Sequence, residues 1–130
     1  MSIKVLVVDD YPMNRDLLKR ILAEPEFLVA DAQDGLEALQ LLSQQTFDVV
    51  LLDVMMPGMD GIEVCRHLRE DLGNESLPVF FITALDPDET INANLNSVTD
   101  YIRKPFNKAE VRDKVKRAVL GGGEDSAGQS

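Results

Sequence analysis

Short apolar runs alternate with longer stretches of helical periodicity along this chain. The clearest runs are Val5-Leu6-Val7-Val8 and Val49-Val50-Leu51-Leu52, and each is followed directly by aspartate. Runs of β-branched and aliphatic residues between helical patterns are typical of buried parallel strands. The pattern predicts five strands, at residues 4–8, 28–32, 49–53, 79–83 and 100–103.

Helix starts are marked by an Asp or Asn three residues before a glutamate, which is the spacing of a capping box. Asp34, Asp60, Asp86 and Asn107 occupy this position, and one more helix begins near Pro12. Apolar residues then recur at helical spacing, so each helix has one face for a sheet. The predicted buried stripes are Met13, Leu17 and Ile21; Leu36, Leu39 and Leu42; Ile62, Cys65 and Leu68; Ile91, Leu95 and Val98; and Val111, Val115, Ala118 and Val119.

Strict alternation of strands and helices with short links predicts right-handed crossovers. The fold class is therefore α/β: a flavodoxin-like, doubly wound (βα)5 fold with a parallel five-stranded sheet of order 2-1-3-4-5 and helices on both faces. In that order the first and third strands are neighbours. Asp9 and Asp10 should then lie beside Asp53 at the carboxyl edge of the sheet, where such folds place their chemistry.

Length and charge limit the classes of function. The 130 residues fit one domain, over residues 1–120, and residues 121–130 have the Gly, Ser and acidic composition of a flexible tail. The net charge of -10 argues against direct binding to nucleic acid or anionic lipid. No apolar segment approaches the roughly 20 residues that span a bilayer, and no secretory signal is recognisable, so we expect a cytoplasmic protein without membrane contact.

The aspartates predict a metal site. Asp9, Asp10 and Asp53 would repel one another unless a cation neutralises them, which favours a divalent metal, magnesium above all. Thr83 ends the fourth predicted strand and Lys104 follows the fifth, at the same edge. A hydroxyl, an ammonium and a metal together form a cradle for phosphoryl oxygens.

Other reactive residues have simpler interpretations. Cys65 is the only cysteine, so it can form no intrachain disulfide, and its place on a helical stripe predicts a buried small hydrophobe. His67 lies off that stripe and is predicted to face solvent. Arg15 and the basic residues of the last helix are interleaved with acids, as on a solvated face. These residues of the last helix are Lys108, Arg112, Lys114, Lys116 and Arg117.

Residues 3 to about 120 resemble the receiver domain of two-component response regulators. The resemblance rests on four motifs in the right order and strand context: Asp9-Asp10, the stretch from Asp53 to Gly61, Thr83-Ala84, and Lys104-Pro105-Phe106. It implies that the Lys104-Pro105 peptide is cis. One departure is the segment 94–100, which lacks the glycine that receivers usually carry before the fifth strand.

The resemblance assigns roles to these residues. Asp53 would be the phosphoacceptor, and Mg²⁺ would be bound directly by Asp10, Asp53 and the carbonyl of Met55, with Asp9 holding it mainly through water. Thr83 and Lys104 would contact the phosphoryl group and act with Asp53 in catalysis. The switch residues would be Thr83 and Tyr101.

The implied function is a phosphoacceptor module in a two-component phosphorelay. The phosphoryl donor would be a phosphohistidine on a histidine kinase or a histidine phosphotransfer protein. The signal would pass to a downstream protein target or to a tethered output domain. Such a module is a signalling protein rather than an enzyme, although it transfers a phosphoryl group to its own aspartate and dephosphorylates itself.

Three alternatives remain at this point. A receiver-fold module that binds partners without phosphorylation would not need the intact acidic cluster. A magnesium-dependent phosphatase with an aspartyl nucleophile would carry a second aspartate two residues after Asp53, where Met55 stands. A flavin carrier of the same topology would have a hydroxyl-rich or Gly-rich loop after the first strand, where Asp9-Asp10-Tyr11-Pro12 stands.

Overall fold

Strands and helices alternate through the computed structural model, which describes residues 2–84, 98 and 100–121. The strands are β1 (Ile3–Val8), β2 (Phe27–Ala32), β3 (Val49–Asp53), β4 (Val79–Thr83) and β5 (Asp100–Arg103). The helices are α1 (Pro12–Ile21), α2 (Gly35–Gln44), α3 (Gly61–Glu70), α5 (Lys108–Lys116) and the π-helical turn η2 (Arg117–Gly121). No described helix has both the length and the apolar content needed to cross a bilayer.

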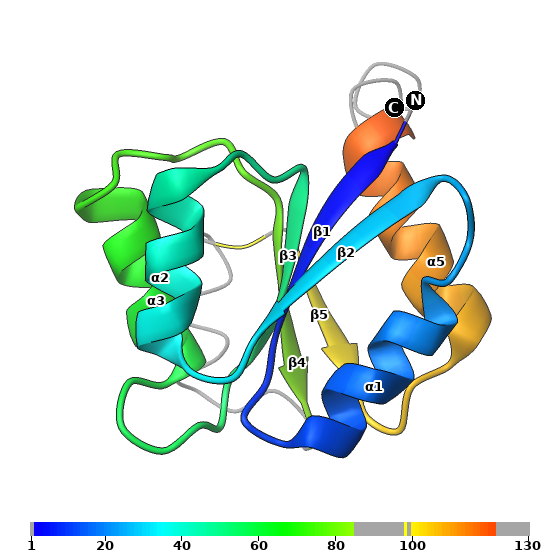
Figure 1. Ribbon diagram of the computed structural model, residues 1–130, viewed down its shortest axis with the longest axis horizontal. Helices are drawn as coiled ribbons and strands as arrows, with labels where there is room; N and C mark the ends of the chain where they lie inside the picture. Colours follow the sequence, from blue (N-terminus) through cyan, green and yellow to red (C-terminus); the bar gives the residue numbers. More distant parts are fainter. Residues whose placement is uncertain (1, 85–97, 99, 122–130) are drawn as a thin grey trace.

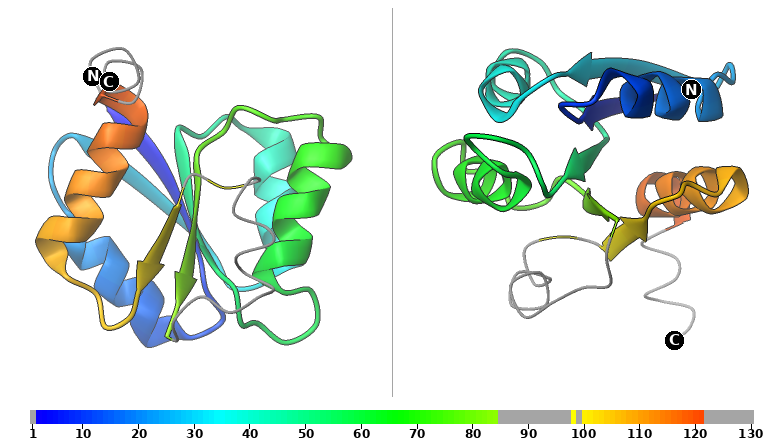
Figure 2. Two further views of the ribbon diagram at one scale, coloured as in Figure 1. Left: turned by 180° about the vertical axis from the view of Figure 1, so that it is seen from behind. Right: turned by 90° about the horizontal axis from the view of Figure 1, so that it is seen from below.

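The five strands form one parallel sheet of order β2-β1-β3-β4-β5, which confirms the predicted topology. The helices α2 and α3 cover one face of the sheet, and α1 and α5 cover the other (Figures 1 and 2). Val8 of β1 is paired with Leu52 of β3. The residues that follow these two strand positions therefore emerge side by side at the carboxyl edge.

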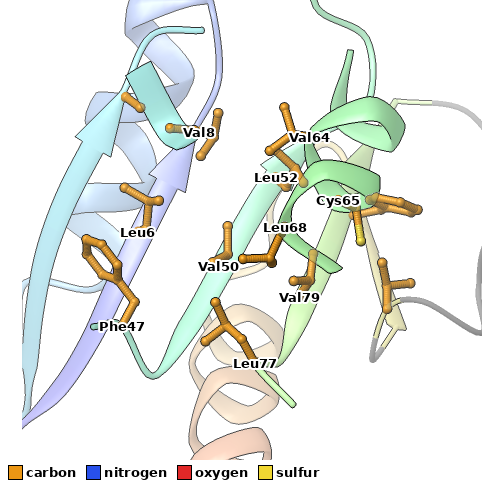
Figure 3. Packing of buried hydrophobic residues seen from close by; sticks show 14 of the residues in the cluster. Leu6, Val8, Phe47, Val50, Leu52, Val64, Cys65, Leu68, Leu77 and Val79 are labelled. Atoms are coloured by element: carbon orange, nitrogen blue, oxygen red, sulfur yellow. The ribbon is translucent and has the colours of Figure 1, made fainter. Parts of the chain in front are cut away.

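Two apolar clusters, one on each face of the sheet, form the core. Successive β1 side chains point to opposite faces and so belong to the two clusters in turn. Leu6 and Val8 face α2 and α3, whereas Val5 and Val7 face α1 and α5. Figure 3 shows the first cluster, in which side chains of α3 pack over β3 and β4. Because all four β1 residues are buried, the strand is a continuous apolar run rather than an alternating one.

The predicted caps are confirmed at α2, α3 and α5. The side chains of Asp34, Asp60 and Asn107 each accept a hydrogen bond from the backbone N–H three residues later, at 2.8, 2.9 and 2.9 Å. Pro12 begins α1, as predicted. The cap predicted at Asp86, the helix after it and the glycine-free segment before β5 fall largely outside the described residues.

The predicted stripes are wrong in part for α1 and α2. Met13 and Leu17 are 67% and 41% exposed, and Leu18 is buried instead. Leu36 is 63% exposed, and Ala38 takes the buried position of α2. Where two apolar residues are adjacent, the sequence does not show which of them lies on the buried face of the helix. Packing against the sheet decides which one is buried. The stripes of α3 and α5 are confirmed, with buried residues Cys65, Leu68, Val111 and Val115.

The solvated face predicted for the last helix is also wrong in part. Arg112 donates hydrogen bonds of 2.7 Å to the carbonyl of Ile21 and to Glu24, which ties α5 to the end of α1. Lys114 donates to the carbonyl of Tyr101 at 2.9 Å and so ties α5 to β5. Long basic side chains lay their stems along the protein while their heads reach polar partners.

Candidate functional site

The carboxyl ends of β1 and β3 bring three carboxylates together. Asp9, Asp10 and Asp53 offer oxygen atoms that all lie within 4.8 Å of one another. Asp9 is fully buried and Asp53 is 3% exposed, whereas Asp10 is exposed. The neighbouring positions of β1 and β3 in the sheet produce this cluster, as the strand order implies.

Lys104 reaches the same cluster from the end of β5. Its ammonium lies 3.5 Å from Oδ2 of Asp9 and 3.6 Å from Oδ1 of Asp53. Thr83, at the end of β4, is 2% exposed, and its carbonyl accepts the backbone N–H of Lys104 at 2.8 Å. The Lys104-Pro105 peptide is cis, as expected. All the strand-end residues singled out in the sequence thus converge on one edge.

Of two further predicted residues, Met55 borders this cluster and Tyr101 lies within β5, three residues before Lys104. The backbone N–H of Met55 donates to Oδ1 of Asp53 at 3.3 Å, while the Met55 side chain is 71% exposed. Tyr101 in β5 is half-buried, and the ammonium of Lys114 lies 5.8 Å from the centre of its ring. Met55 is therefore at the rim of the site. Tyr101 lies one strand beyond β4, and its ring packs against the apolar cluster on the α2 and α3 face of the sheet.

The site holds uncompensated negative charge. Burial, with the nearby Asp9, raises the pKa of Asp53 to about 7, although Lys104 and the Met55 N–H oppose the shift and Asp10 adds to it. None of the described residues donates a hydrogen bond to the buried Oδ2 of Asp9. Buried oxygens without a hydrogen-bond donor are rare, and this one, with the Lys104 ammonium 3.5 Å away, is suited to a further cation or a water. Because Mg²⁺ is bound through carboxylate oxygens, the residues present fit such an ion.

A family model described as the response regulator receiver domain matches residues 5–116. The chain belongs to this family. Receiver domains are signalling modules, which agrees with the class of protein expected from the motifs. The match also covers every strand-end residue of the acidic cluster, Thr83 and Lys104 included.

Curated relatives carry the receiver domain within longer proteins. Response regulator MprA of Mycobacterium sp. (strain KMS) is 42% identical over 121 residues, which is 92% of this chain and 51% of MprA. Response regulator PleD of Caulobacter vibrioides (strain NA1000 / CB15N) is 42% identical over 108 residues, 82% of this chain and 24% of PleD. The chain therefore spans about half of the length of MprA and about a quarter of the length of PleD.

Solved structures of receiver domains have the same fold. Chemotaxis protein CheY4 of Vibrio cholerae superposes with a TM-score of 0.84 at 30% identity, covering 92% of this chain and all of CheY4. The receiver domain of sensor histidine kinase PA1611 from Pseudomonas aeruginosa PAO1 gives a TM-score of 0.82 at 26% identity, with 92% and 98% of the two chains covered. That domain was solved with a magnesium ion coordinated in its active site cleft.

Gly61 allows α3 to start directly against the end of β3 and so helps to place Asp53. Its N–H donates to the carbonyl of Val54 at 3.0 Å, and a Cβ at this position would lie 2.3 Å from the Asp53 carbonyl oxygen. We expect Gly61→Ala to lower the free energy of unfolding by about 2–3 kcal/mol, measured by urea denaturation. Glu70→Ala, at the exposed end of the same helix, should change it by about 0.5 kcal/mol or less. Equal losses in the two variants would contradict this role.

Arg15 is a residue of this region that sequence reasoning missed. It was predicted on a solvated face, but its side chain is 15% exposed, and its guanidinium donates to the carbonyl of Asp9 at 2.7 Å and to Asp31 at 3.1 Å. Its spacing from the aspartates, one helical turn into α1, was the only signal in the sequence. His67, by contrast, lies on α3 away from the cluster, is half-buried and pairs with Asp71.

Proposed function

We propose that this receiver domain takes a phosphoryl group from a phosphohistidine onto Asp53. Mg²⁺ would be held by Asp10, Asp53 and the carbonyl of Met55, with Asp9 acting mainly through water. The observation that carries the proposal is the environment of Asp53. Its carboxylate is buried, lies beside Asp9 and is 3.6 Å from the ammonium of Lys104.

The chemistry requires positioning more than a strong nucleophile. An oxygen of Asp53 forms a bond to phosphorus while the bond from phosphorus to the imidazole nitrogen breaks, and the electron pair of that bond stays with the imidazole. Lys104 and Thr83 stabilise the phosphoryl oxygens. When bound, Mg²⁺ would neutralise charge on the phosphoryl and carboxylate oxygens. The three negative carboxylates would then be balanced by the +2 charge of the ion and the +1 charge of Lys104.

The alternatives fit the site less well. A module that binds without phosphorylation has no use for three clustered carboxylates beside a single lysine, because buried charge that is not fully compensated lowers stability. An aspartyl-phosphate phosphatase needs an acid or base near its nucleophile, and Met55, two residues after Asp53, has a thioether at that point. Both remain less favoured than phosphoacceptor signalling.

Exposed apolar side chains at the rim suit contact with a donor protein. Tyr11, Met13 and Met55 are 53%, 67% and 71% exposed, and all three follow the aspartates closely in the sequence. A histidine kinase or phosphotransfer protein would cover them while presenting its phosphohistidine. The signal would pass to a protein target or to an output domain tethered after residues 1–120 by the Gly- and Ser-containing segment 121–130.

Phosphorylation should switch the β5 and α5 side of the domain. Lys114 contacts both the carbonyl and the ring of Tyr101, so a movement of Tyr101 would be passed to α5. With Mg²⁺ and beryllofluoride, a mimic of the phosphoryl group, we expect backbone NMR shifts to be larger in residues 84–101 and in α5 than in α2. Asp53→Ala should show none of them. Shifts confined to the acidic cluster would contradict the proposed switch.

A further inference from the structure

The guanidinium of Arg15 joins the ends of two neighbouring strands. Its Nη1 donates to the carbonyl oxygen of Asp9, after β1, at 2.7 Å, and its Nε donates to Oδ2 of Asp31, in β2, at 3.1 Å. The Arg15 and Asp31 side chains are 15% and 30% exposed, so the contacts of the guanidinium are partly shielded from water. Charge-assisted bonds in such a setting are stronger than those between neutral groups.

With the contact from Arg15, both backbone groups and one carboxylate oxygen of Asp9 have hydrogen-bond partners. The N–H of Asp9 donates to the carbonyl of Ala32 at 3.2 Å, and its Oδ1 accepts the N–H of Tyr11 at 2.9 Å. Arg15 holds the remaining backbone group, the carbonyl. This carbonyl belongs to the peptide that links Asp9 to Asp10, so Arg15 sets the plane from which both carboxylates extend.

Asp31 in turn holds the guanidinium. Its Oδ2 also accepts Lys19 at 3.2 Å, and the Lys19 side chain is 42% exposed. Two different nitrogens of the rigid, planar guanidinium each meet one acceptor, an arrangement that the single nitrogen of a lysine does not match. Lys19 shares the carboxylate of Asp31 without any contact to Asp9 that the structure records, which makes it a matched control.

We infer that Arg15 is a positioning residue for the magnesium site and acts on the ion through the carbonyl of Asp9. The inference rests on the proposed function, because it presupposes that Asp9 and Asp10 hold Mg²⁺. Groups that orient metal ligands from the next layer of structure commonly change metal affinity by about 10- to 100-fold when they are replaced.

The sign of the effect separates positioning from simple charge. A guanidinium near a cation site repels the cation, so its removal would tighten Mg²⁺ binding if charge alone mattered. Positioning predicts the opposite, a weaker site. Arg15→Lys keeps the charge but loses the two-nitrogen geometry of the guanidinium, so it tests positioning without altering the charge.

The test is calorimetric titration of Mg²⁺ into the full chain. We expect Arg15→Lys and Arg15→Gln to raise the Kd for Mg²⁺ about tenfold, and Lys19→Gln to leave it within about twofold. Labelling of Asp53 by acetyl phosphate gives a second readout. At saturating Mg²⁺ the rate for Arg15→Lys should return to that of wild type, so that the half-saturating Mg²⁺ concentration changes and the limiting rate does not.

Several outcomes would overturn the inference. Unchanged or tighter Mg²⁺ binding in both Arg15 variants would do so, and so would an equal loss in Lys19→Gln, which would indicate general loosening of α1. If Arg15→Gln fails to fold, Asp31→Asn, which keeps Arg15 but removes its anchor, should also weaken binding. A wild-type chain that binds no Mg²⁺ would instead refute the proposed function.

Discussion

Replacement of Asp53 by alanine should abolish phosphorylation of the receiver domain by acetyl phosphate. The proposed acceptor is the carboxylate of Asp53, and alanine leaves no nucleophile beside the ammonium of Lys104. Intact-mass analysis after incubation with acetyl phosphate and Mg²⁺ should show one added phosphoryl group in the wild type and none in the variant. Removal of Mg²⁺ by a chelator should suppress the labelling of the wild type, because the charge on the phosphoryl oxygens is then poorly neutralised.

Asp48→Ala is the matched control for this experiment. Asp48 is exposed and precedes β3, whereas Asp53 ends it, so the two aspartates lie at opposite ends of one strand. The control variant should be labelled like the wild type. Equal labelling of Asp53→Ala, or labelling that survives chelation, would show that another residue or another chemistry takes up the phosphoryl group.

The sequence predicted those features that depend on local signals. The strands of the sheet centre could be identified because runs such as Val49-Val50-Leu51-Leu52 are short, aliphatic and uninterrupted. The caps at Asp34 and Asp60 could be identified because capping needs only a side chain and the N–H three residues later. The strand order followed from alternation and handedness, and it placed Asp53 beside the aspartates of β1.

Features that depend on contacts between distant elements could not be predicted in this way. Leu17 and Leu18 are equally apolar, and only packing of α1 against the sheet buries the second. Arg15 looked like a surface residue because its acceptors belong to β2 and to the end of β1, which come together only in the fold. Arg112 was misjudged for the same reason, since it bonds to the far end of α1.

In Mg²⁺-free buffer, Asp53→Asn should make the receiver domain more stable than the wild type. The pKa of Asp53 is raised from 3.8 to about 7, mainly by burial and next by Asp9. Between these values the folded state binds a proton that the unfolded state has lost, so stability falls as the pH rises through this window. Such a shift corresponds to a destabilisation on the order of 4 kcal/mol above pH 7, which asparagine removes.

The pH dependence makes the second prediction specific. At pH 8 the variant should have the larger free energy of unfolding, by about 2–4 kcal/mol, and the difference should shrink towards pH 5 as the wild-type carboxyl becomes protonated in the folded state. Urea denaturation at a series of pH values measures it. Asp16→Asn, at an exposed position of α1, controls for the loss of one negative charge and should show no such trend.

Magnesium should reverse the order of stability. A ligand that binds only the folded state stabilises it in proportion to its affinity, and the wild type keeps all three carboxylates for the ion whereas Asp53→Asn keeps two. The advantage of the variant at pH 8 should therefore shrink as Mg²⁺ is added and change sign at saturating Mg²⁺. If the variant is less stable than the wild type without Mg²⁺, repulsion within the cluster is not a significant burden, and the contact of Asp53 with Lys104 outweighs it.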